Sequence, residues 1–211
     1  MLETIIPKIK GFLFDPVVTF QTSRTDETRT VISCFGILLL FNAVLAAAFE
    51  MLLLFLSFLL SAGSAGTGGM SSQSPETALV MVFVLPVLLF FTILVGGSLF
   101  MFVFSLWTHL WVYLLGGRNG FRLTLHAILY GMTPSLLLGW IPLIGMFASI
   151  WALILMFFGI RELQEMSDGS TIGVLLLSVF LPLIVLAVIF VLAIVYLASG
   201  GGLFSPYSSI Q

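Results

Sequence analysis

Glu50 is the residue of this chain whose type and position most favour chemistry, because it is an acid inside a long apolar run. It shares one face of a predicted helix with Asn42, Ala46 and Ser57, since these positions recur at about 3.6 residues per turn. An acid inside a bilayer costs about 2.5 to 3.5 kcal/mol on insertion scales unless it is paired or protonated. We therefore expect this face to contact protein or water. Glu50 itself is either part of an ion or proton site, or a structural acid that is protonated or hydrogen-bonded.

Two histidines and a tyrosine form a second polar group. His109 and His126 are expected near one membrane surface, on the opposite side from Glu50, and Tyr130 follows His126 by about one helical turn. Two histidines lack the four ligands of a structural zinc site, so interfacial hydrogen bonding is favoured over a metal site or a proton relay. The candidate intramembrane polar site consists of Glu50, Asn42, His126 and Tyr130.

Common motifs of enzyme active sites are absent from the sequence. It has no Gly-x-Ser-x-Gly, no His-Glu-x-x-His and no glycine-rich phosphate-binding loop. Cys34 is the one cysteine, which excludes an intramolecular disulfide and a metal site built from cysteines. We therefore expect no catalytic residue, no metal and no cofactor. The 7 Lys and Arg residues form no basic cluster large enough to suggest nucleic acid binding.

Long hydrophobic segments must position these side chains. Apolar residues make up 60% of the chain and charged residues 8%, far below the roughly 25% charge of a soluble domain. A membrane-spanning helix needs about 20 apolar residues to cross about 30 Å of hydrocarbon. Five segments qualify, at 31–60, 78–115, 121–140, 141–160 and 172–198. The sequence therefore predicts an all-α, polytopic membrane helix bundle with five transmembrane helices.

The basic residues predict the topology. They fall before the first segment, between the second and third, and after the fourth, whereas the connections 60–77 and 138–140 contain no Lys or Arg. By the positive-inside rule, the amino terminus is expected in the cytoplasm and the carboxyl terminus outside. We expect a cytoplasmic segment at 1–29, a membrane domain at 30–200 and an external tail at 201–211.

Two segments have features of their own. Residues 78–115 would measure about 57 Å as one helix, so we expect tilting, projection from the membrane or a break at Pro86 or Gly96-Gly97. Near the amino terminus, apolar residues recur at helical spacing opposite Glu3, Lys8 and Lys10. This pattern predicts an interfacial amphipathic helix, ended by Asp15-Pro16.

The predicted inner loops carry a candidate surface for docking a cytoplasmic partner or anionic lipid. Its residues are Lys8, Lys10, Arg118, Arg122, Arg161 and Glu162. The alternative is an ordinary solvated helix end, in which Arg161 pairs with Glu165 four residues later. Helix packing is predicted at Pro134, where neighbouring hydroxyls permit a kink, and at small residues. These small residues are Gly145, Ser149 and Gly159.

A series of short motifs supports a resemblance to a known family. They are Asp15-Pro16, Gly116-Gly117 before a basic turn, Tyr130 with Pro134, Pro142 with Gly145, and Arg161-Glu162-Leu163. In this order they resemble the Yip1 domain family of five-span membrane proteins. Eukaryotic members act in traffic between the endoplasmic reticulum and Golgi, bind Rab-type GTPases and form hetero-oligomers. The chain has only about 30 residues before its first segment and is similar to the short prokaryotic members.

The resemblance implies a non-enzymatic membrane organiser of the trafficking-scaffold type, located in a prokaryotic cell membrane. Its expected partners are the lipid bilayer, a cytoplasmic protein, and further membrane proteins in a homo- or hetero-oligomer. The alternative is a small channel or transporter for an ion or solute, with Glu50 in its pathway.

Overall fold

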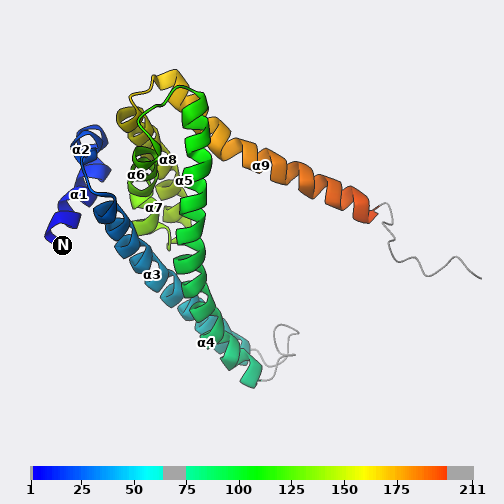
Figure 1. Cartoon of the computed structure of the whole chain (residues 1–211). Coiled ribbons are helices and arrows are strands. Elements are labelled where there is room, and N and C mark those ends of the chain that lie inside the picture. Colours follow the sequence, from blue (N-terminus) through cyan, green and yellow to red (C-terminus); the bar gives the residue numbers. More distant parts are fainter. Residues whose placement is uncertain (1, 64–74, 199–211) are drawn as a thin grey trace, which may run out of the picture.

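The computed structural model describes residues 2–63 and 75–198, and within them the regular structure is entirely helical (Figure 1). The helices follow in the order α1 (Leu2–Phe14), α2 (Pro16–Ser23), α3 (Thr28–Gly63), α4 (Pro75–Phe91), η2 (Thr92–Gly96), α5 (Gly97–Leu114), α6 (Phe121–Gly131), α7 (Thr133–Leu138), α8 (Pro142–Gln164) and α9 (Asp168–Ala198). The prediction of an all-α fold is confirmed.

Four stretches of the described chain are long and apolar enough to cross a membrane. They are Thr28–Leu60, Val80–Leu114, Pro142–Gln164 and Asp168–Leu197. Most of their surface is not covered by the protein itself, since the most apolar windows of the first and the last are only 6% and 11% buried. Exposed apolar surface on this scale fits a lipid environment, in which helices satisfy their own backbone hydrogen bonds. The chain is therefore an integral membrane protein.

The predicted third segment is not one continuous helix, so the count of five long helices is not confirmed. Its residues form α6, with 11 residues, and α7, with 6, joined at Met132. Pro134 lies in the first turn of α7, where its missing N–H is tolerated because the first N–H groups of a helix have no partner within the helix. The hydroxyl of Thr133 donates to the Tyr130 carbonyl at 2.6 Å. Every residue from 123 to 131 is buried, so α6 lies in the protein interior.

The long second segment is helical throughout, but a short π-helical turn interrupts its α-helix. Pro86 lies inside α4, and the π-helical turn η2 separates α4 from α5 next to Gly97. Of the two sites predicted for a break, the structure uses Gly96-Gly97. A Cβ on Gly97 would lie 3.3 Å from the Leu39 side chain, so α5 passes close to α3 at this point.

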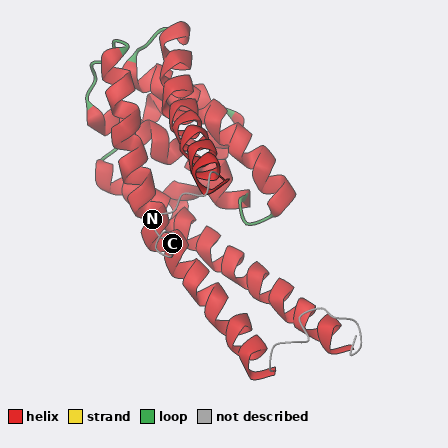
Figure 2. Cartoon of the chain, turned by 90° about the vertical axis from the view of Figure 1, so that its right-hand side faces the viewer, coloured by secondary structure: helices red, strands yellow, loops and turns green. Residues whose placement is uncertain are grey.

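The helices form an uneven bundle (Figure 1, Figure 2). α6, α7 and α8 lie between α3 and α5, while α1 and α2 cover one side and α2 contacts α8. α3 and α4 run side by side away from the rest, and α9 contacts α5 and α8 before it diverges. We call the end that carries the connections 24–27, 115–120 and 165–167 the basic end of the bundle.

The amino-terminal helix contributes to the protein core. α1 ends at Phe14 and Pro16 begins α2, as the Asp15-Pro16 pair predicts. Phe12 is only 1% exposed and packs inside the protein, whereas Ile6 is 63% exposed. The apolar side of α1 is therefore divided between the protein core and the surroundings.

Candidate functional site

Three polar side chains from distant parts of the chain meet at the basic end. Tyr130 on α6 donates its hydroxyl hydrogen to Asp26 Oδ2 over 2.7 Å. Lys8 on α1 donates to the same carboxylate oxygen, and its Nζ lies 3.3 Å from the tyrosine hydroxyl and 5.5 Å from the ring centroid. We call Lys8, Asp26 and Tyr130 the Tyr130 cluster. It joins α1, the α2–α3 connection and α6.

Aromatic packing holds the Tyr130 cluster in place. The Phe12 ring stacks on Tyr130 with centroids 4.5 Å apart, and Phe20 of α2 lies 4.8 Å from Phe12. Phe20 is fully buried against Gly159 of α8, where a Cβ would approach its ring to 2.9 Å and Ala127 Cα to 3.1 Å. The absence of a side chain at Gly159 therefore lets both α2 and α6 pack closely against α8.

The two histidines bond to different threonines. His126 Nε2 lies 3.2 Å from the Thr28 hydroxyl, and within the described residues its buried Nδ1 has no hydrogen-bond partner. His109 Nδ1 lies 2.9 Å from the hydroxyl of Thr124. No group of three His, Cys, Asp or Glu side chains in residues 2–63 and 75–198 is close enough to hold a metal ion.

A buried glutamine fixes the loop between α5 and α6. Gln164, 3% exposed, accepts from the Asn119 N–H at 3.0 Å and donates to Gly120 O and Thr124 Oγ1, both at 2.9 Å. The Asn119 side chain donates to Leu163 O at 3.0 Å. Gly120 has φ +84°, a conformation that glycine adopts readily. These contacts hold the loop residue Arg118 in a defined place.

The charged residues at the end of α8 and just after it pair with other residues of the chain. Arg161 Nε lies 2.8 Å from Asp168 and 3.9 Å from Glu162, which also accepts from Gln21 at 2.9 Å. The predicted pairing of Arg161 with Glu165 is wrong. Glu165 has φ +53° and caps α8 in the left-handed conformation, so it leaves the helical face and pairs with Arg24 instead.

The candidate docking residues thus fall into two sets. Lys8 and Arg161 have acidic partners within the chain, whereas Lys10, Arg118 and Arg122 are exposed. The Arg118 guanidinium lies over the Tyr113 ring, 4.4 Å from its centroid, so one face of this cation is already covered.

The four residues of the predicted intramembrane site lie at different levels. Glu50 is 22 residues beyond Thr28, the neighbour of His126, which is about 33 Å along α3. Within the described residues, the buried Oε2 of Glu50 has no hydrogen-bond partner. Asn42 lies between these levels and donates to Ser135 O at 3.5 Å. The structure therefore brings His126 and Tyr130 to one end, away from Glu50.

The predicted packing residues other than Gly159 lie where α7 meets α8. A Cβ on Gly145 would lie 2.8 Å from Gly139 O. The Ser135 hydroxyl, one residue after Pro134, donates to Ala148 O at 3.3 Å, and Ser149 donates to Gly145 O at 2.8 Å. Small residues and hydroxyls therefore allow the short α7 to lie directly on α8.

Sequence reasoning missed Asp26, Asn119 and Gln164. Asp26 lies in a polar connector next to Glu27, and nothing in the local pattern distinguishes this half-buried acid from its exposed neighbour. Gln164 could have been found from the sequence. It falls on the apolar face of α8, three residues after Arg161, and an uncharged amide at an apolar position indicates a buried hydrogen-bonding residue.

The apolar helices, the interior α6–α7 pair and the charged loops at one end define a polytopic α-helical membrane protein. The sequence model of the Yip1 domain matches residues 10–198, nearly the whole chain. The chain therefore belongs to the Yip1 domain family, and the predicted resemblance is confirmed. No curated protein and no solved structure matches the chain.

Proposed function

We propose that this protein is a non-enzymatic membrane scaffold that recruits a partner at its basic end. The observation that supports the proposal is that some cations of this end are paired with acidic residues of the chain and others are not. Lys8, Arg24 and Arg161 are held by acids of the chain, whereas no ion pair among the described residues includes Lys10 or Arg122. Exposed cations on a fixed surface attract an acidic partner and orient it.

The rigidity of this surface supports recruitment of a partner. Gln164 fixes the α5–α6 loop, and the Tyr130 cluster fixes α1 against α6. A partner that binds a preorganised surface avoids much of the entropy cost of ordering loops. The trafficking type of scaffold is the role that membership of the Yip1 domain family suggests for such a surface.

We infer further that the chain crosses the membrane five times, with α6 and α7 together as one broken crossing. α6 touches the start of α3 through His126 and Thr28, and Trp140, just after α7, packs on Phe49 with ring centroids 6.2 Å apart. Phe49 is 21 residues beyond Thr28, or about 32 Å along α3. This depth matches the hydrocarbon thickness of about 30 Å.

Fusions test the crossing number. Five crossings place the two chain ends on opposite sides, with the basic end in the cytoplasm as the basic loops suggest. We expect alkaline phosphatase to be active when fused after Gln211 and inactive when inserted in the α5–α6 loop at Asn119. Equal activity at both sites would overturn the five-crossing topology.

Crosslinking mass spectrometry in native membranes tests recruitment. The variant Lys10→Gln/Arg118→Gln/Arg122→Gln removes the three exposed cations of the candidate docking surface. Arg24→Gln is the control, because the charge of Arg24 is paired with Glu165. We expect cytoplasmic partners to be recovered with the wild type and the control, and to be lost with the triple variant. Equal recovery from all three proteins, or no partner with any, would refute recruitment by this surface.

A further inference from the structure

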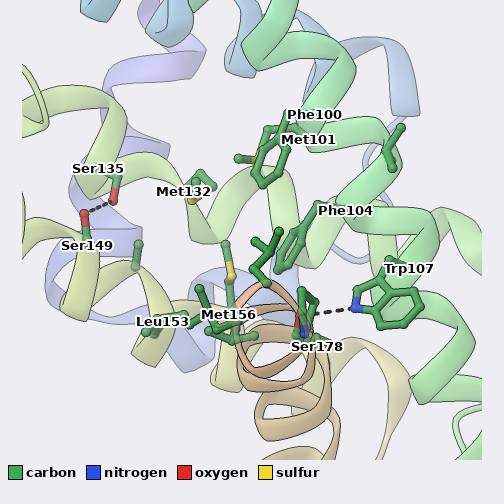
Figure 3. A pocket seen from close by; sticks show the side chains of 16 residues that line it. Phe100, Met101, Phe104, Trp107, Met132, Ser135, Ser149, Leu153, Met156 and Ser178 are labelled. Atoms are coloured by element: carbon green, nitrogen blue, oxygen red, sulfur yellow. Dashed lines mark hydrogen bonds between the residues drawn. The ribbon is translucent and has the colours of Figure 1, made fainter. Parts of the chain in front are cut away.

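A groove of about 520 Å³ lies between α5, α8 and α9 (Figure 3). Its floor is buried, with Ala152 and Met156 each 2% exposed, while its rim is open, with Leu183 55% exposed. The side chains of Phe104 and Trp107 form the α5 wall. Its volume falls within the roughly 300 to 1,000 Å³ of small-molecule sites.

The depth of this groove excludes most water-soluble ligands. Its three walls come from stretches that are long and apolar enough to span a membrane. Trp107 is 7 residues before the end of α5, and Ser149 is 15 residues before the end of α8, which places them about 10 and 22 Å from the basic end. A groove at these depths opens to hydrocarbon, so its occupant is apolar.

A second hollow, of about 550 Å³, extends the groove towards the basic end. It runs along α5 from Val103 to Tyr113 and shares Val103 and Trp107 with the first. Together the two hollows follow α5 from Phe100 to Tyr113, a rise of about 20 Å over 13 residues. One leaflet of the hydrocarbon core is about 15 Å thick, half of the full thickness. The combined track is therefore long enough to hold one acyl chain of a single leaflet.

Arg118, a cation, lies where this track reaches the basic end. The guanidinium of Arg118 lies 4.4 Å from the Tyr113 ring centroid, and Tyr113 lines the last part of the track. The neighbouring Asn119 is bonded to Gln164 and Leu163, which fixes the loop that bears Arg118. A guanidinium binds phosphate oxygens through two parallel hydrogen bonds.

We propose that this track binds an anionic phospholipid of the leaflet at the basic end. One acyl chain lies along α5, next to α8 and α9 in the first hollow and against α5 in the second, and the headgroup phosphate bonds to Arg118. The apolar lining, a length that is sufficient for one leaflet, and the cation at the end of the track all fit a lipid. A helix of a second copy would leave Arg118 without an anionic ligand.

Native mass spectrometry of the protein extracted from vesicles of phosphatidylglycerol and phosphatidylcholine tests the proposal. Arg118→Gln removes the headgroup contact. Arg29→Gln is its matched control, because Arg29 is an exposed arginine at the start of α3 that lines neither of the two hollows. Val179→Trp fills the groove with a large side chain. Val188→Trp is its control, because position 188 is nine residues further along α9 and lies on the opposite face of that helix.

We expect Arg118→Gln to lower the retention of phosphatidylglycerol about fivefold relative to wild type, the effect of one cation near an anionic membrane surface. Val179→Trp should remove retention of both lipids, and the two controls should retain lipid as the wild type does. Equal loss in Arg118→Gln and Arg29→Gln, or full retention in Val179→Trp, would overturn the site. A dimer without bound lipid would overturn it too, by showing that a second copy covers the track.

Discussion

Removal of the Tyr130 hydroxyl should loosen α1 and α2 from the rest of the protein. The variant Tyr130→Phe keeps the ring stacked on Phe12 and deletes only the 2.7 Å hydrogen bond to Asp26. Hydrogen bonds to charged groups contribute about 1.5 to 3 kcal/mol, and because Lys8 remains on the carboxylate the loss should be near the lower value, about 1.5 kcal/mol. Each 1.4 kcal/mol is a factor of about ten, so the detached population should rise about tenfold.

The single cysteine provides the assay. Cys34 is 3% exposed, belongs to the same buried cluster as Phe12 and Phe20, and lies close enough to Lys8 and Asp26 to interact with them electrostatically. Its thiol should react with a water-soluble maleimide only when α1 and α2 detach. In nanodiscs, we expect Tyr130→Phe to label about ten times faster than the wild type, in proportion to the detached population.

A second tyrosine supplies the control. Tyr113 is 56% exposed and contacts Arg118 through its ring, so Tyr113→Phe should label at the wild-type rate. A labelling rate for Tyr130→Phe within twofold of the wild type would refute the reasoning. It would mean either that the bond contributes little, or that Cys34 becomes accessible without movement of α1 and α2.

Two further predictions concern packing and buried hydrogen bonds. Gly159→Ala should raise the rate at which Cys34 is labelled, because the new Cβ would approach the Phe20 ring to 2.9 Å and overpacking costs about 1 to 3 kcal/mol. Gly36→Ala is the control and should leave the rate unchanged, since a Cβ there would have nothing within 4 Å. Equal labelling rates in the two variants would contradict this prediction. Gln164→Leu removes the partner of the Asn119 N–H and of the Gly120 carbonyl, and it should lower the free energy of unfolding by about 3 kcal/mol in a denaturant titration. An unshifted midpoint would show that these bonds are not needed.

The sequence predicted features that depend on neighbouring residues. Runs of apolar residues marked the four long stretches, and Asp15-Pro16 marked the boundary between α1 and α2. A local pattern could not predict the bond between Asp26 and Tyr130, because 104 residues separate them and their meeting depends on how α1, α3 and α6 pack. The spacing rule also failed for the pair of Arg161 and Glu165. A pairing between residues i and i+4 requires a helix that continues to the second residue, and here Glu165 adopts the left-handed conformation at the helix end.

The π-helical turn η2 has a consequence for sequence alignment within the family. Val82 on α4 and Met101 on α5 are both buried, and 19 residues separate them, which would put them about 100° apart on an uninterrupted α-helix. A π turn accommodates one extra residue, and without that residue the spacing of 18 is five full α-helical turns, so both residues lie on one face. Relatives whose helix is α-helical throughout should therefore align with a gap of one residue between Phe91 and Gly97.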